Sequence, residues 1–333
     1  MSQRILQLDF LKGIMIVLVI MFHIVLFDKT YPNLRTAVYT FHVPVFLLIS
    51  GYLSNIERTP SDFLKVILRL LVPYVFFETL YMVVLYVMGL TMHSTLAMNT
   101  LSIKDISIRL LAYPLGVYWY LHALIVCNVA YYLIFHYLKL NTASKFVLLA
   151  LVCYGITYVI KEIWWAPILA GSGFVWDSIL YFLIGVFIKL VGVPFLKMIP
   201  ASCLSAIPLC LLFSSTSNFY RGSLSGITIT LLVISFLLFV YNHIGTSIRY
   251  FWDYLGRNSL AIFVFAPFFI PITKYAIPLF CFDGTVLLFT MFACSFSILC
   301  SLVSAMVSDK LGISKYLFFK EAIYVPYRKC QSQ

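Results

Sequence analysis

Long apolar runs follow one another along the whole chain and limit its fold more than any other feature. A helix that crosses the hydrocarbon core of a bilayer needs about 20 mostly apolar residues, and ten runs approach that length. Their limits are 8–27, 36–55, 65–90, 117–138, 146–160, 174–191, 198–213, 224–241, 257–278 and 284–307. The sequence therefore predicts an all-α integral membrane protein with about ten transmembrane helices, embedded in a lipid bilayer.

The composition argues against a water-soluble fold and against a nucleic-acid partner. Hydrophobic residues make up 62% of the 333 and charged residues only 11%, whereas soluble domains carry roughly a quarter charged residues. The net charge of +11 would suit a nucleic-acid binder, but the cations sit singly between apolar runs. The eight cysteines show no C-x-x-C spacing, so neither a metal site nor a disulfide framework is expected.

The distribution of lysine and arginine predicts the orientation. With the N-terminus in the cytoplasm, 16 of the 23 cations fall in cytoplasmic segments and the other 7 in outer ones, in agreement with the positive-inside rule. Both termini are therefore expected in the cytoplasm. Residues 5–307 would form the transmembrane domain, and residues 308–333 a basic cytoplasmic tail that begins on the inner leaflet. The oligomeric state stays open.

Three polar residues interrupt the first apolar run: Asp9, Lys12 and His23. On a helix with 100° per residue, Lys12 and His23 lie ~20° apart and Asp9 lies ~60° from Lys12. All three share one face, which we expect to point into the bundle because polar groups at membrane depth are costly. His23 stands ~16 Å beyond Lys12 along the axis. The alternative is a snorkelling Lys12 and a structural His23.

His42 and Glu78 are expected near the same membrane depth as His23. His42 lies roughly 9 Å inside the second run, and Glu78 lies ~20 Å from the inner surface. A carboxylate at that depth needs a partner, and a histidine is the nearest candidate by depth. We therefore expect one shared polar cavity; the alternative for His42 is a place among the headgroups.

Further candidates lie at the cytoplasmic ends of the runs. Lys65 and Arg69 are one helical turn apart and face the same side. Arg257, Asn258 and Ser259 open the ninth run, where a capped helix start offers free N–H donors to an anion. The alternatives are membrane anchoring by the cations and an ordinary helix cap.

Five short motifs follow one another in a recognisable order. They cover 8–13 (LDFLKG) with His23, 41–46 (FHVPVF) with 50–52 (SGY), 69–74 (RLLVPY), 119–121 (WYL) and 256–260 (GRNSL). Together they resemble the membrane-integral acyltransferase 3 family, and in particular its fucose-4-O-acetylase-like branch, over roughly residues 5–305. The chain departs from the family pattern at Lys12, commonly arginine, at Val66, often arginine, and at Ala266, often histidine.

The resemblance implies acyl transfer, usually of acetyl, to a hydroxyl of a carbohydrate or lipid-linked glycan at a bacterial inner membrane. Acetyl-CoA is the expected acyl donor and co-substrate. Coenzyme A carries phosphates that would meet cations and helix N-termini at the cytoplasmic mouth. The candidates for this contact are Lys12, Lys65, Arg69, Arg257, Asn258 and Ser259.

A sugar hydroxyl needs a base with a pKa near 7 to attack a thioester, and histidine provides one. His23 is the first candidate, either as a direct base or as an acyl-imidazole carrier. The supporting roles are acceptor binding or second base for His42, charge balance for Glu78 or Asp9, oxyanion donation for Ser50, Tyr52 or Asn258, and sugar stacking for Trp119 and Tyr120. The membrane's aromatic belt is the alternative for the last two.

The competing class is a transporter or flippase that moves a glycan or a small anion through the same polar cavity without chemistry. Transporters typically show inverted repeats and paired broken helices, and the sequence shows no internal repeat. An acyltransferase is therefore the preferred interpretation.

Overall fold

The computed structural model describes residues 4–55, 58–92, 101–138 and 174–327, together with residues 147, 152 and 155. Within these residues the chain is helical or irregular, and no strand occurs. The all-α prediction therefore holds for the described part. The predicted run 146–160 falls almost entirely outside it.

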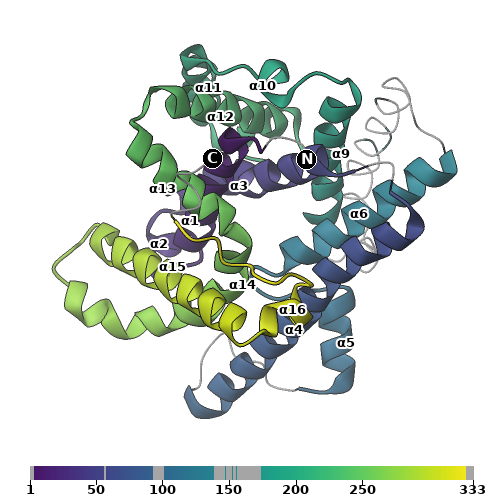
Figure 1. The fold of residues 1–333 in the computed structure, drawn as a ribbon. Helices are drawn as coiled ribbons and strands as arrows, with labels where there is room; N and C mark the ends of the chain where they lie inside the picture. The colour runs from purple at the N-terminus through teal and green to yellow at the C-terminus, as the bar shows by residue number, and fades with distance from the viewer. Residues whose placement is uncertain are drawn as a thin grey trace. The chain divides into compact units, whose positions relative to one another are not determined.

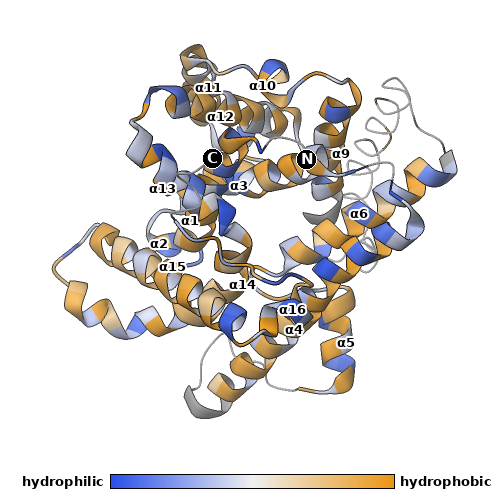
Figure 2. Cartoon of the chain, in the orientation of Figure 1, coloured by the Kyte–Doolittle hydropathy of each residue, from blue (hydrophilic) through white to orange (hydrophobic). Residues whose placement is uncertain are grey.

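Six of the described helices are long and apolar enough to cross a bilayer. They span Pro32–Leu53, Pro60–Met88, Trp119–Tyr137, Leu224–His243, Ser259–Phe280 and Leu287–Lys310, and each coincides with a predicted run. On the last of them, helix α15, large apolar side chains such as Met291 and Leu299 are about two-thirds exposed, and Figure 2 shows it predominantly hydrophobic along its length. Such a surface suits lipid rather than water. The count of ten spans and the cytoplasmic termini stay predictions.

The chain divides into two compact units, each described here by itself. The first comprises residues 1–54, 181–312 and 321–333 and contains most of the helices labelled in Figure 1. Its elements are α1 (Leu6–Met21), α2 (Val25–Thr30), α3 (Pro32–Leu53), most of α9 (Phe174–Leu190), α10 (Phe195–Met198), η1 (Cys203–Ser205), α11 (Ala206–Phe213), η2 (Thr216–Asn218), α12 (Leu224–His243), α13 (Thr246–Arg257), α14 (Ser259–Phe269), η3 (Ile270–Phe280) and α15 (Leu287–Lys310).

Helix α1 is the centre of this unit and packs against α3, α12, α13, α14 and α15. Its closest neighbour is α13, where two glycines take the place of side chains. A Cβ atom on Gly256 would lie 1.7 Å from the backbone oxygen of Asp9, and one on Gly13 would lie 2.1 Å from that of Trp252. Small residues allow helix backbones to touch in this way. The contact fixes the register that brings Arg257 beside Asp9.

A second glycine crossing joins α3 to α9. A Cβ atom on Gly51 would lie 2.0 Å from the backbone oxygen of Phe182, and one on Gly185 would lie 2.0 Å from that of Leu48. The helix α3 that carries His42 is therefore held between two close packing partners, α1 and α9.

Helix α1 ends earlier than the run 8–27 predicts. It stops at Met21, residues 22–24 form a turn, and α2 begins at Val25. The backbone N–H of His23 donates to the Ile20 carbonyl at 3.0 Å, while its side-chain Nδ1 takes the Val19 carbonyl that a continuing helix would use. One continuous helix over 8–27 is therefore corrected to α1 followed by α2.

The ninth run also divides. Helix α14 ends at Phe269, and the rest of the predicted run 257–278 lies in the 3₁₀ helix Ile270–Phe280. Pro271 and Pro278 lie within that segment, and neither has the N–H that an α-helix needs. The run 198–213 similarly divides into three short helices from α10 to α11.

The second unit comprises residues 55–180 and 313–320. It contains α4 (Pro60–Met92), α5 (Ile103–Leu111), α6 (Trp119–Leu138), the start of α9 and α16 (Ile313–Leu317). Helix α4 packs against α5, α6 and α16. The Tyr74 hydroxyl donates to the Leu110 carbonyl at 2.8 Å, and the rings of Phe63 and Tyr132 stack 3.8 Å apart.

Candidate functional site

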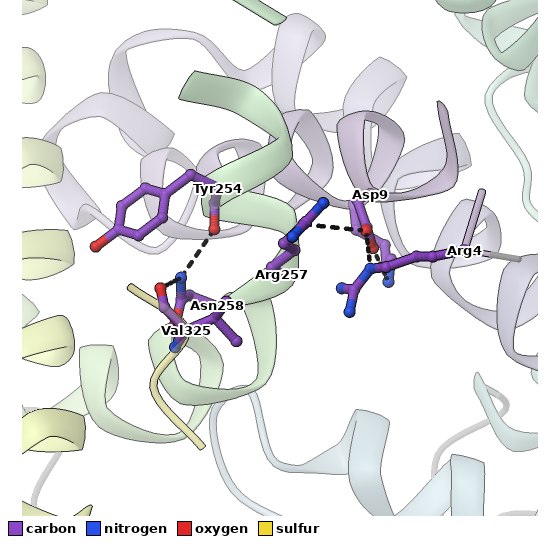
Figure 3. Close-up of polar contacts among 7 residues, drawn as sticks. Arg4, Asp9, Tyr254, Arg257, Asn258 and Val325 are labelled. Carbon is purple, nitrogen blue, oxygen red and sulfur yellow. Dashed lines mark hydrogen bonds and ion pairs between the residues drawn. The ribbon is translucent and has the colours of Figure 1, made fainter. Parts of the chain in front are cut away.

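A cluster of cations surrounds Asp9 in the first turn of α1 (Figure 3). Its Oδ2 accepts a hydrogen bond from Arg4 Nε at 2.5 Å and lies 3.7 Å from Arg257 Nε, and its Oδ1 lies 2.7 Å from Lys12 Nζ. The side chains of Asp9 and Arg257 are only 3% and 2% exposed. A buried charge must be paired to be tolerated. Here one carboxylate lies within 4 Å of three cations, so the cluster brings several positive charges together at the start of α1.

Asp253 belongs to the same neighbourhood, and the sequence interpretation missed it. It lies on α13, four residues before Arg257, and is 2% exposed. Burial and the nearby charge of Asp9 raise its pKa to about 7, against the opposing effects of Arg257, Arg249 and Arg4. The available signal was the spacing of Asp253 and Arg257, which places both on one face of a helix.

Asn258 has a different role from the predicted helix cap. It occupies the break between α13 and α14, and its side chain makes no capping bond to α14. Instead Nδ2 donates to the carbonyls of Tyr254 and Val325 at 2.9 and 3.0 Å, and Oδ1 accepts the Val325 N–H at 2.8 Å (Figure 3). The expectation that Asn258 caps α14 was wrong, because its side-chain amide bonds to Tyr254 and to Val325 of the C-terminal segment instead. Ser259 follows as the first residue of α14.

The two histidines are held in the same way. His23 Nδ1 lies 2.6 Å from the Val19 carbonyl and His42 Nδ1 lies 2.7 Å from the Val38 carbonyl. A carbonyl can only accept, so Nδ1 carries the proton in both rings. In the neutral imidazole the basic nitrogen is then Nε2. In both histidines Nε2 is therefore the nitrogen that can accept a proton.

Tyr39 connects the surroundings of the two histidines. Its hydroxyl donates to the carbonyl of Phe22, next to His23, at 3.4 Å, and its ring meets that of His42 edge to face at 4.9 Å between centroids. Tyr39 therefore links the ring of His42 with the turn that holds His23. It is an addition that the sequence interpretation did not single out.

Asp28 is the carboxylate whose charge acts on His23. It lies on α2, and its Oδ2 accepts a hydrogen bond from Arg35 at 3.1 Å. Its Oδ1 is buried and has no hydrogen-bond partner among the described residues. An unsatisfied buried oxygen of this kind is costly in a fold, so Asp28 offers a free acceptor beside the histidines.

The cation cluster and the histidines occupy opposite ends of α1. The eleven residues from Lys12 to His23 correspond to about 16 Å along the axis, and the fourteen from Asp9 to about 21 Å. Asp9 is therefore too far from His23 to contact it. The arrangement offers one region that can hold an anion and another that can take up a proton.

Glu78 lies in the second unit, on α4, and is fully buried. Its Oε1 accepts the backbone N–H of Leu115 at 2.6 Å, which ties α4 to the loop before α6. Its Oε2 is buried with no hydrogen-bond partner among the described residues. The predicted pairing of Glu78 with a histidine stays a prediction.

The remaining predicted residues are placed as follows. Lys65 is exposed and pairs with Asp62 at 3.0 Å, and Arg69 is exposed on the same helix. Trp119 and Tyr120 are half-buried in the first turn of α6. In the first unit Ser50 is half-buried on α3, and the Tyr52 hydroxyl accepts the backbone N–H of Phe195 at 3.3 Å.

Comparisons with known proteins match nearly the whole chain to one family. The sequence profile of a family described as "Acyltransferase domain" matches residues 5–306. A stretch of 134 residues is 31% identical to the nodulation protein NolL of Mesorhizobium japonicum, and it covers 37% of this chain and 34% of that protein. The match therefore spans about a third of the length of this curated relative. No solved structure matches the chain.

Proposed function

Because the chain belongs to this acyltransferase family, we propose that it is a membrane-bound O-acetyltransferase of the bacterial inner membrane. It transfers an acetyl group from acetyl-CoA to a hydroxyl of a cell-surface carbohydrate or of its lipid-linked precursor. The observation that carries the proposal is the arrangement on α1, with an anion-binding cluster at one end and a base at the other.

The donor binds at the cation cluster. Coenzyme A presents a pyrophosphate and a ribose phosphate, and these groups favour charge-assisted contacts with lysine and arginine. Lys12 and Arg257 supply such contacts, because both cations lie beside Asp9 in one cluster. Ser259, at the N-terminus of α14, adds backbone N–H donors. Lys65 and Arg69 stay candidates for contacts with the donor phosphates.

The chemical step belongs to His23. Its Nε2 takes the proton of the acceptor hydroxyl, and the resulting oxygen nucleophile attacks the thioester carbonyl carbon. The C–S bond then breaks, and the imidazolium returns the proton to the departing CoA sulfur. The contact of Nδ1 with Val19 supports this role, because it fixes the tautomer and the ring orientation. Transfer through an acetyl-imidazole on the same nitrogen uses the same geometry.

The neighbours of His23 assist this step. Asp28 balances the charge of the imidazolium that forms, a role for which Asp9 lies too far away. His42 binds the acceptor or acts as the second base. Ser50 and Tyr52 stay candidates for oxyanion donors, Trp119 and Tyr120 for stacking on the sugar, and Glu78 for charge balance.

Substitution of His23 tests the proposal. Membranes that contain the protein are incubated with [¹⁴C]acetyl-CoA, and label is counted in the carbohydrate fraction before and after mild alkali, which releases esters but not amides. We expect alkali-labile label with the wild type and a loss of at least about 100-fold with His23→Ala, the typical contribution of a catalytic base.

His243→Ala is the matched control. His243 Nδ1 also contacts a backbone carbonyl, that of Phe239 at 2.8 Å, but the residue is exposed at the end of α12. The control should keep wild-type transfer. Full transfer by a folded His23→Ala protein would refute the role of His23, and the absence of label with the wild type would refute the activity.

A further inference from the structure

The C-terminal segment 321–327 is an ordered strap on the first unit. Val325 is fastened to Asn258 by two hydrogen bonds, one in each direction. With the bond to the Tyr254 carbonyl, both N–H groups of the Asn258 amide and its oxygen are in use. This amide therefore has no free N–H to offer to a phosphate.

The strap is held at a second point by α15. The Asp309 carboxylate accepts the backbone N–H of Ile323 at 3.0 Å on Oδ1 and that of Tyr324 at 2.9 Å on Oδ2. The hydroxyls of Tyr254 and Tyr324 lie 3.2 Å apart. Hydrogen bonds to a charged group are the stronger kind, so Asp309 is the principal anchor away from Asn258.

The strap binds next to the cation cluster. Asn258 directly follows Arg257, the last residue of α13, and Figure 3 shows Arg257 reaching from this junction towards Asp9 while Val325 lies below Asn258. The other side of α13 is fixed because Gly256 meets the backbone of α1. Arg257 is thus positioned between a rigid helix crossing and the strap.

We propose that the strap is a positioning element of the donor site, which holds the α13–α14 junction so that Arg257 meets the nucleotide end of coenzyme A. In this assignment Asn258 and Asp309 act on the donor only through Arg257. The inference rests on the proposed function.

The test measures donor binding separately from turnover. Purified full-length protein is titrated with CoA and with adenosine 3′,5′-bisphosphate, and the KM for acetyl-CoA and the kcat of label transfer are determined. Asp309→Asn should weaken the binding of both probes and raise the KM about tenfold, the effect of misplacing one charge-assisted hydrogen bond. The kcat should stay within about twofold, because His23 is unaffected.

Asp283→Asn is the matched control. Asp283 lies at the other end of α15 and accepts backbone N–H groups in the same manner, at 2.9 Å from Thr285 and 2.7 Å from Leu288. The control should lose comparable thermal stability without a change in the KM. A tenfold rise with Asp283→Asn as well would show that the effect is general destabilisation, and would overturn the proposal.

Asn258→Leu completes the set. If the strap acts as proposed, Asn258→Leu and Asp309→Asn raise the KM alike, and the double variant adds little, since both release the same segment. Loss of binding with Asn258→Leu alone, and not with Asp309→Asn, would mean that Asn258 binds the donor directly. Failure of the proposed function is a separate result, because the wild type would then neither bind CoA nor transfer label.

Discussion

At the scale of single residues, the polar groups inside the apolar runs were the informative part of the sequence. Asp9, Lys12, His23 and His42 were identified because each is costly in a bilayer, and the structure gives each a partner. Their partners were harder to predict. Asp253 lies near Asp9, and Val325 bonds to Asn258, only because distant parts of the chain meet, which periodicity does not reveal.

Asp253 makes stability depend on pH. Its pKa is about 7 in the fold against a usual 3.8, so the folded state holds this proton more tightly than the unfolded state does. The associated stability, at most about 4 kcal/mol, is present below about pH 4 and is lost as the pH rises to about 7. Asp253→Asn removes this dependence.

Thermal unfolding in detergent measures the effect. The melting temperature of Asp253→Asn minus that of the wild type should be more positive at pH 8 than at pH 4.5. A difference that is less positive at pH 8 than at pH 4.5 would mean that the pKa of Asp253 is lowered in the fold, with Arg249 and Arg257 outweighing its burial.

At the scale of the elements, the glycine crossing between α1 and α13 controls the cation cluster. Gly13 and Gly256 bring the two backbones into contact. Asp9 on α1 and Arg257 on α13 lie next to these glycines and pair with each other. The apolar pattern placed α1, but it did not predict the crossing, because a glycine in a sequence does not show what lies opposite. The end of α1 at Met21 was missed for a similar reason, since it depends on the bond from His23 to Val19.

Gly256→Ala should separate these helices. The added methyl group would overlap the Asp9 carbonyl, and overpacking of this kind costs about 1–3 kcal/mol. We expect a lower melting temperature together with weaker CoA binding, because Arg257 moves away from Asp9. Gly245→Ala is the control, since a Cβ atom there meets nothing within 4 Å. Normal CoA binding by a folded Gly256→Ala protein would separate the crossing from the donor site.

At the scale of the whole molecule, the membrane determines which side chains are exposed. Apolar residues such as Leu211 and Leu299 are exposed by 70% and 62%, while Asp9 and Asn258 are buried. Hydropathy predicted the positions of the six described spans well because lipid selects for it directly. It did not predict the division into two units or the return of residues 321–327 to the first unit.

Reporter fusions test the orientation. With both termini in the cytoplasm, a fluorescent protein at the C-terminus should be bright and an alkaline phosphatase there inactive. The same phosphatase inserted at Gly284, in the predicted outer loop before α15, should be active. The opposite pattern at both sites would invert the topology and place the cation cluster on the outer side.

The contact of Asp9 with Arg257 can form only late in biosynthesis. The two residues are about 250 positions apart, and a ribosome needs roughly 12–50 s to cover that distance. Until then α1 stays in or beside the translocation machinery, and α13, the helix against which it packs, has not been synthesised. Asp9 has Arg4 and Lys12 within 3 Å during that interval, so a local ion triplet can shield the carboxylate until Arg257 is made. Substitution of Arg4 should therefore impair membrane insertion of the nascent chain more than it impairs the finished enzyme.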